Sequence, residues 1–211
     1  MADTPIRCIV GLGNPGAKHE GDRHNVGFWL VDRLARRYGG SLRPETKFQG
    51  EFVKVNAEAG DCFLLKPTTF MNASGRSVSA LAKFYKIDVS EMLVVHDELD
   101  MEPGVVRLKT GGGHGGHNGL RDISSALGKD FHRARVGIGH PGHKDAVAGY
   151  VLSRPNKVDQ DKIEQGLDEL ERVISDVLKG DLQGAMRELH SRTSKFPSNK
   201  KGALWRLFCC R

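Results

Sequence analysis

Short apolar or alternating segments recur along the chain and predict the strands of a β-sheet. They are enriched in β-branched residues or alternate between apolar and polar positions, as buried and half-buried strands do. The predicted strands cover residues 6–11, 48–55, 62–66, 92–96, 105–109 and 133–139.

Apolar residues spaced three and four apart predict helices between several of these strands. The stripes are Phe28, Val31, Leu34, Ala35 and Tyr38; Val78, Leu81, Ala82 and Tyr85; and Ile163, Leu167, Leu170, Ile174 and Val177. Further helices are expected over residues 118–127 and 182–189. Strands alternating with helices predict an α/β fold, a single layered domain with a mixed, mostly parallel twisted sheet flanked by helices.

Length and composition suit one globular domain. The chain has 211 residues, 38% of them hydrophobic, and no shift in composition divides it. We expect residues 1–193 to form the domain and residues 194–211 to form a mobile basic tail. No apolar run approaches the roughly 18 residues of a membrane helix, and the first residues do not resemble a signal peptide. The four cysteines include no C-x-x-C pair, which fits a protein of the reducing cytoplasm. No contact with a membrane is expected.

The formal net charge of +6 lies mainly near the end of the chain. After Glu188 there are six Lys and Arg residues and no Asp or Glu, so 32 − 6 = 26 basic residues face 26 acidic ones in the body. A local excess of 7 − 3 = +4 remains between residues 105 and 145. Its basic members are Arg107, Lys109, Arg121, Lys129, Arg133, Arg135 and Lys144. If an anion binds the body of the protein, this stretch is where it is expected to bind.

Residues 11–16 match the G-x-G-x-x-G spacing of dinucleotide-binding turns. Such a turn needs a helix that starts at the glycines and an acidic residue that closes the next strand. Here Pro15 has no N–H to donate, the polar stretch 17–25 delays the helix, and Asp32 lies within that helix. We therefore interpret the glycines as a turn that presents polar side chains, and expect no cofactor.

His24 and Asp97 are the candidates for acid–base chemistry. His24 follows the glycine turn, and Asp97 lies at the carboxyl end of a buried strand, where α/β sheets place catalytic acids. A carboxylate bonded to one ring nitrogen fixes the tautomer of a histidine and favours proton uptake. The chain has no G-x-S-x-G and no cysteine in a nucleophile setting, so water is the expected nucleophile.

A positioned base contributes about 10²–10⁴-fold, so an efficient hydrolase also stabilises the oxyanion. Asn14, Asn72 and Asn118 suit that work, because an amide donates to developing negative charge. Each has a structural alternative: Asn72 and Asn118 precede helical patterns and could be N-caps, and Asn14 could shape a turn before Pro15. The glycine-rich run 111–119 predicts a lid or a substrate wall.

Seven residues could bind a catalytic metal: His24, His96, Asp97, His114, His117, His140 and His143. The chain lacks H-E-x-x-H, and histidines on a glycine-rich loop are poorly preorganised, so a site without metal is favoured. Two alternatives remain open. One is a metal-dependent hydrolase, and the other is a non-catalytic RNA-binding module that uses the basic stretch and the tail.

Six motifs follow one another along the chain. They are GLGNPG at 11–16, RHNVG at 23–27, PTTFMN at 67–72, HDELD at 96–100, GGGHGGHNGL at 111–120 and GIGHPG at 137–142. In this order they resemble the motifs of the bacterial peptidyl-tRNA hydrolase family and span most of residues 6–190. One such motif is weak evidence, whereas six collinear motifs are specific.

The resemblance implies a monomeric, metal-independent enzyme that cleaves the ester between a peptide and the 3′-terminal ribose of tRNA. Such an enzyme recycles tRNA from peptidyl-tRNA released prematurely by ribosomes. The resemblance implies that His24 is the base for the attacking water and that Asp97 holds its basic form. It also implies that Asn14 distinguishes blocked from free aminoacyl ends, and that Asn72 and Asn118 position substrate and water.

The resemblance further implies residues that bind the tRNA. His19 and Phe70 occupy positions that line the site for the tRNA end. Lys109, Arg135 and Lys144 match basic positions associated with tRNA phosphates, and they fall within the +4 stretch.

Two positions depart from the family pattern. His19 stands where the family usually has Tyr, and Asp22 stands where it often has Thr. An imidazole can still stack or form hydrogen bonds, but the contact of a phenol does not carry over to position 19.

Overall fold

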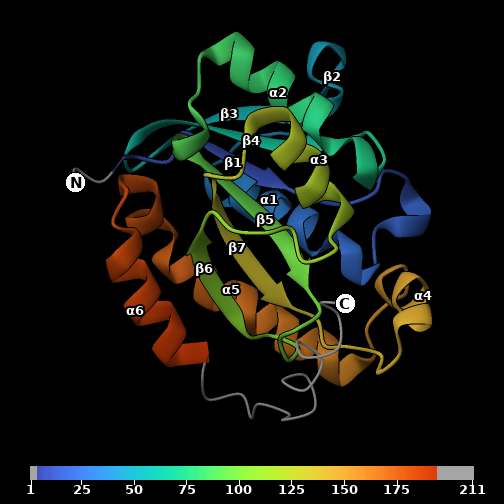
Figure 1. Cartoon of the computed structure of the whole chain (residues 1–211). Helices are drawn as coiled ribbons and strands as arrows, with labels where there is room; N and C mark the ends of the chain where they lie inside the picture. Colours follow the sequence, from blue (N-terminus) through green and yellow to red (C-terminus); the bar gives the residue numbers. More distant parts are fainter. Residues whose placement is uncertain (1–3, 194–211) are drawn as a thin grey trace.

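A mixed sheet of seven strands, in the order β2-β3-β4-β1-β5-β7-β6, forms the centre of the protein (Figure 1). The computed structural model describes residues 4–193, so the predicted tail 194–211 lies outside the described residues. The strands are β1 (Cys8–Gly11), β2 (Arg43–Glu45), β3 (Gly50–Ala57), β4 (Gly60–Pro67), β5 (Met92–Glu98), β6 (Val106–Thr110) and β7 (His132–Gly137).

The sheet has a parallel centre and antiparallel edges. β1 pairs in parallel with β4 and β5, and β5 pairs in parallel with β7. On one side β3 and β2 continue the sheet as antiparallel strands, and on the other side β6 pairs antiparallel with β7. The predicted mixed sheet is confirmed, and its parallel strands bring several carboxyl ends to one edge.

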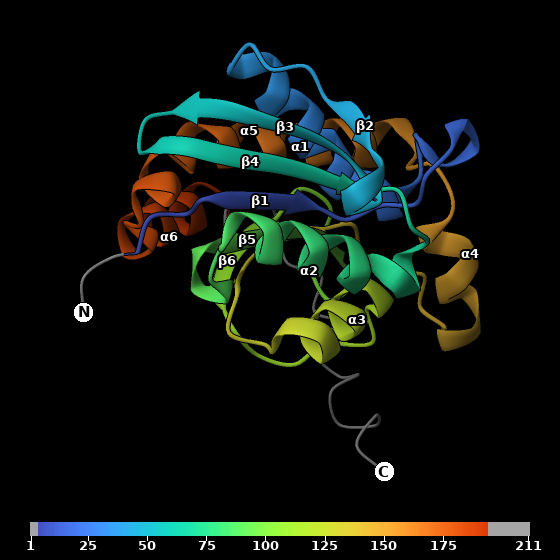
Figure 2. The same ribbon diagram turned by 90° about the horizontal axis from the view of Figure 1, so that it is seen from above.

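Helices cover both faces of this sheet (Figure 2). The helices are α1 (Val26–Arg37), α2 (Ser74–Tyr85), α3 (Asn118–Leu127), α4 (Val147–Val151), α5 (Lys157–Lys179) and α6 (Leu182–Thr193). Successive strand residues supply two cores: Ile9 packs with α1, α5 and α6, whereas Cys8 and Val10 pack with α2 and α3. Both faces are therefore buried, which is why the central strands read as continuous apolar runs. Within residues 4–193, no helix is both long and apolar enough to cross a membrane.

The predicted strand 48–55 was wrong at its start. Residues Thr46–Phe48 form a 3₁₀-helix, whose first turn the Glu45 side chain caps by accepting a hydrogen bond from the Lys47 N–H (3.3 Å). Gln49 then adopts a left-handed conformation (φ 46°), and β3 begins at Gly50. The apolar Phe48 is buried, but from a turn and not from a strand.

Close packing between α1 and the ends of β1 and β5 positions the site. The first helical turn contains Gly27, and a Cβ there would lie 2.3 Å from the Leu12 nitrogen and 2.5 Å from the Val95 oxygen. Those two atoms are themselves hydrogen bonded at 3.0 Å. The helix starts at Val26, well after the glycine turn, so these glycines do not open α1.

Gly27→Ala is expected to lower the free energy of unfolding by about 1–3 kcal/mol or more, because overpacking separates backbone atoms of two strands. Urea unfolding measures the change. Gly149→Ala in α4 is the matched control, since its Cβ would meet no atom within 4 Å. Equal stability of the two variants would contradict the close approach of α1 to the sheet.

Candidate active site

The 3₁₀-turn Arg23–Asn25 lies at the centre of the site. A 3₁₀-helix has about three residues per turn, so three consecutive side chains point in three directions. His24 contacts Asp97 on β5, Asn25 contacts Asn14 after β1, and Arg23 contacts the segment that follows α4. The turn therefore joins three separate parts of the fold.

One carboxylate oxygen bonds two histidines. Asp97 Oδ1 lies 2.7 Å from His24 Nδ1 and 3.0 Å from His117 Nε2. The ring centroids of the two histidines are 4.9 Å apart. His117 Nδ1 accepts a hydrogen bond from the Leu120 N–H (3.4 Å), so the proton of a neutral His117 lies on Nε2 and is donated to Asp97. Sequence reasoning considered His117 as a metal ligand and missed this contact.

Electrostatics keeps this carboxylate charged. Burial opposes ionisation of Asp97, but the nearby His24 and His117 rings outweigh it and hold the pKa of Asp97 well below its usual range. Burial likewise disfavours protonation of His24, yet the charge and hydrogen bond of Asp97, with a smaller effect of Asp22, raise the pKa of His24. Neutral His24 donates its Nδ1 proton to Asp97, which leaves the Nε2 lone pair to accept a proton.

His96 precedes Asp97 and plays a different part. Its Nδ1 donates to the Asp97 carbonyl oxygen (2.7 Å), and its buried Nε2 has no hydrogen-bond partner in the described structure. Burial, with repulsion from His117, lowers the pKa of His96 to about 3. A neutral ring that is 2% exposed cannot exchange protons with substrate, so His96 supports the strand end.

Three of the predicted metal-ligand candidates do come together. One ligand atom each from His24, Asp97 and His117 lies within 4.8 Å of the others. The remaining candidates, His96, His114, His140 and His143, join no such group in the described chain. Asp97 Oδ1 already bonds His24 Nδ1 and His117 Nε2, so a cation between these three atoms would compete with both hydrogen bonds.

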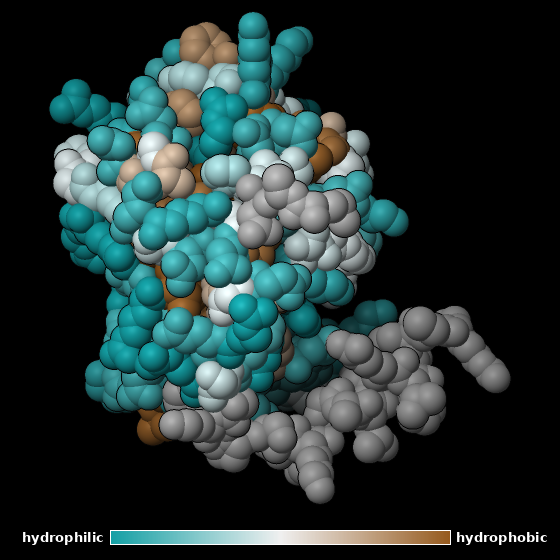
Figure 3. All heavy atoms as spheres, turned by 90° about the vertical axis from the view of Figure 1, so that its left-hand side faces the viewer, coloured by the Kyte–Doolittle hydropathy of each residue, from teal (hydrophilic) through white to brown (hydrophobic). Residues whose placement is uncertain are grey.

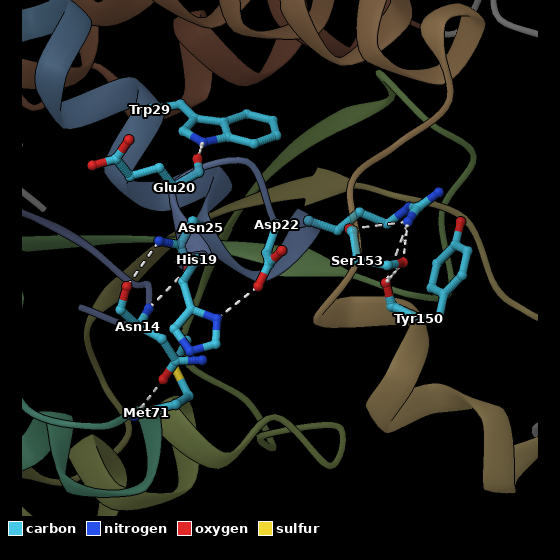
Figure 4. Close-up of polar contacts among 10 residues, drawn as sticks. Asn14, His19, Glu20, Asp22, Asn25, Trp29, Met71, Tyr150 and Ser153 are labelled. Atoms are coloured by element: carbon cyan, nitrogen blue, oxygen red, sulfur yellow. Dashed lines mark hydrogen bonds and ion pairs between the residues drawn. The ribbon is translucent and has the colours of Figure 1, made fainter. Parts of the chain in front are cut away.

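Asn14 forms hydrogen bonds with Asn25 and Met71 (Figure 4). Its N–H donates to Asn25 Oδ1 (2.9 Å), and Asn25 Nδ2 donates to the Asn14 carbonyl oxygen (2.9 Å). Asn14 Oδ1 accepts from the Met71 N–H (3.0 Å). Asn14 therefore joins the loop after β1 to the loop that contains Met71. These contacts are more than the shaping of a turn before Pro15.

Asn72 and Asn118 are exposed at the rim of the same loops. The alternative in which they cap helices was wrong: the residues before α2 and α3 are Ala73 and His117. Asn72 lies inside a 3₁₀-turn, and Asn118 is the first residue of α3. Phe70, beside Asn72, is 68% exposed.

The two atypical residues contact each other. His19 Nδ1 lies 2.7 Å from Asp22 Oδ2, and the Asp22 side chain is 7% exposed (Figure 4). Asp22 also begins the turn that carries His24, but its carboxylate does not cap that turn. A buried carboxylate needs a partner, and His19 is that partner.

The predicted tRNA-binding cations lie on separate elements, and within residues 4–193 no hydrogen bond or ion pair joins them to His24. Lys109 is exposed on β6, Lys144 is exposed between β7 and α4, and Arg135 on β7 bonds Glu98 through Nε (3.0 Å).

The glycine-rich run 111–119 is bonded to β7 near its start, because Arg133 donates to the carbonyl oxygens of Gly112 and Gly113, both at 2.6 Å.

Fold and site together define an α/β enzyme with a histidine–carboxylate pair at the carboxyl edge of a parallel-centred sheet. The chain belongs to the peptidyl-tRNA hydrolase family, whose model matches residues 8–198.

Known relatives match nearly the whole chain. The peptidyl-tRNA hydrolase of Haemophilus ducreyi is 57% identical over 190 residues, 89% of this chain and 98% of the relative. That of Halorhodospira halophila is 55% identical over 187 residues, 88% and 96% of the two chains. A crystal structure of peptidyl-tRNA hydrolase from Acinetobacter baumannii superposes with a TM-score of 0.87 at 47% identity, covering 90% of this chain and 96% of that chain.

Asp97→Asn is expected to lower the pKa of His24, because it removes the negative charge that outweighs the burial of the ring. NMR titration of the His24 ring measures the shift. Asp100→Asn, at an exposed carboxylate three residues further on, is the control and leaves the titration unchanged. An unaltered His24 titration in Asp97→Asn would contradict this account of the pair.

Proposed function

We propose that this protein hydrolyses the ester between the peptide and the tRNA in peptidyl-tRNA, with water activated by His24. The observation that supports this mechanism is the hydrogen bond between His24 Nδ1 and Asp97 Oδ1 (2.7 Å). Because Nδ1 donates to Asp97, His24 Nε2 is left to accept a proton. Membership of the peptidyl-tRNA hydrolase family supports the choice of substrate.

The steps follow from the protonation states. His24 Nε2 takes a proton from water as the oxygen attacks the ester carbonyl, and Asp97 stabilises the imidazolium that forms. The protonated ring then gives its proton to the 3′ oxygen of the ribose as the ester bond breaks. The products are free tRNA and the peptide. The reaction thereby recycles tRNA from peptidyl-tRNA that ribosomes release prematurely.

The asparagines supply the polar contacts of the reaction. We propose that exposed Asn72 and Asn118 position the ester and the water and donate to the oxyanion. Asn14 Oδ1 is occupied by the Met71 N–H, so its amide Nδ2 is the group offered to the substrate. We propose that this donor recognises the carbonyl of a blocked amino end.

The tRNA would lie over the predicted basic contacts and the rim of the site. We propose that Lys109, Arg135 and Lys144 contact phosphates, and that His19 and Phe70 line the site for the 3′ end. The face in Figure 3 is mostly hydrophilic, with hydrophobic residues scattered over it. We propose that the protein acts as a monomer in the cytoplasm.

His24→Ala is expected to reduce turnover of an N-blocked aminoacyl-tRNA by about 10²–10⁴-fold, since it removes a positioned base. Release of the blocked amino acid is the measurement, and the free-amine form of the same tRNA is spared by the wild type. In the wild type, kcat/KM falls as the pH drops through the raised pKa of His24, because the base must be neutral. A fully active His24→Ala would refute the assignment.

Exhaustive chelation separates this mechanism from a metal-dependent one that uses His24, Asp97 and His117. The rate is expected to stay unchanged, because the two hydrogen bonds to Asp97 already hold the histidines. Loss of activity on chelation and recovery with added metal would favour the metallohydrolase. Salt-sensitive tRNA binding without ester cleavage would favour a non-catalytic RNA-binding module.

Lys109→Ala is expected to weaken tRNA binding and to reduce the slope of log affinity against log salt by about 1, the effect of one lost phosphate contact. Filter binding over a range of salt concentrations measures both quantities. Lys83→Ala, at an exposed lysine on α2, is the charge-matched control. An unchanged slope in Lys109→Ala would remove this residue from the proposed interface.

A further inference from the structure

Arg23, the neighbour of His24, is a buried cation with neutral partners. The residue is 6% exposed. Its Nη1 lies within hydrogen-bond distance of Ser153 Oγ (2.7 Å) and of the carbonyl oxygens of Arg154 (3.0 Å), Ser153 (3.1 Å) and Tyr150 (3.3 Å). One such nitrogen has two protons, so these four oxygens share them. A buried charge is costly, and here the dipoles of the oxygen acceptors offset that cost, since Arg23 forms no ion pair within residues 4–193.

The contacts form one network at the end of α4. The Ser153 hydroxyl accepts from Arg23 and donates to the Tyr150 carbonyl oxygen at 2.8 Å (Figure 4). The Arg23 guanidinium carbon lies 4.0 Å from the centroid of the Tyr150 ring, a cation–π contact. Tyr150 Oη in turn donates to the Ile138 carbonyl oxygen (2.6 Å), just beyond β7. The guanidinium thereby connects the turn of His24 to a segment that is itself tied to the sheet.

The main chain strengthens this connection. The Arg23 N–H donates to the Ser153 carbonyl oxygen (3.1 Å), so backbone and side chain of one residue bind the same segment. On the other side of the turn, Asn25 and Asn14 exchange two hydrogen bonds. His24 lies between these two anchors, and its ring reaches Asp97. The direction of the imidazole is therefore set by its neighbours as well as by its carboxylate.

We propose that Arg23 is a positioning residue for the reaction, which locks the turn of His24 against residues 150–154 and so fixes the ring of His24 for attack by water. The inference rests on the proposed function for its kinetic consequence. Misplacing a catalytic group by about 1 Å can cost on the order of 100-fold in rate. Loss of the contacts between Arg23 and residues 150–154 is therefore expected to lower kcat more than it weakens substrate binding.

The kinetic test compares Arg23→Ala, Arg23→Lys and Ser153→Ala with Arg36→Ala, which removes an exposed arginine from α1. On N-blocked aminoacyl-tRNA, Arg23→Ala is expected to lose about 100-fold in kcat with KM within about threefold. Arg23→Lys keeps the charge and loses less, and Ser153→Ala, which removes one of four acceptors, loses least. Guanidinium ion at millimolar concentration is expected to restore part of the kcat of Arg23→Ala. Arg36→Ala behaves as the wild type.

A second measurement does not depend on activity. NMR of the free protein follows the His24 ring, whose Nδ1–H signal is expected to shift or broaden in Arg23→Ala and Ser153→Ala but not in Arg36→Ala. Absence of peptidyl-tRNA hydrolysis by the wild type would refute the proposed function, and this spectrum would still decide the role of Arg23. If Arg23→Ala fails to fold, Ser153→Ala and Arg23→Lys carry the same comparison.

Three results would overturn the inference. One is an unchanged kcat together with an unchanged His24 signal in folded Arg23 variants. Another is a rise in KM alone, which would make Arg23 a phosphate ligand. The third is a loss of activity equal to the unfolded fraction measured by circular dichroism, which would make the residue a stabiliser of the fold only.

Discussion

The hydrogen bond between His24 and Asp97 is the interaction on which the rest of the site depends. It joins residues 73 positions apart, because β1 and β5 are parallel neighbours whose carboxyl ends meet at one edge. Both side chains are largely buried, so their attraction is weakly screened. The same Oδ1 also binds His117, and the glycine run is thereby tied to the strand end.

On one side of this pair the polar side chains are buried and hydrogen bonded, and on the other side they face solvent. Asn14, Arg23 and Arg133 are buried and bond the loops around the site. Asn72 and Asn118, proposed to meet the substrate, are exposed. This division suits an enzyme for a large polymeric substrate, because a preorganised base lies behind residues that the substrate can reach.

Local patterns predicted the elements that bury apolar stripes, and they failed where the elements are short. The helices α1, α2, α3, α5 and α6 and the central strands were found as expected. β2, with only three residues, and α4, with five, carry too few positions for a period to emerge. The same limit applies to the site. His24 and Asp97 were paired from their chemistry, but the contact of His117 with Asp97 was missed, because the glycine-rich run has no periodic apolar pattern from which its position could be predicted.

The sequence by itself determined the family, the parallel-centred fold and the residues that could act as base, carboxylate and amide donors. Side-chain chemistry and six collinear motifs carry that information locally. Only the tertiary structure decided that one carboxylate oxygen bonds two histidines, that His19 and Asp22 contact each other, and that Arg23 binds residues 150–154. These contacts join positions far apart in the chain or depend on ring orientation, and a linear pattern encodes neither.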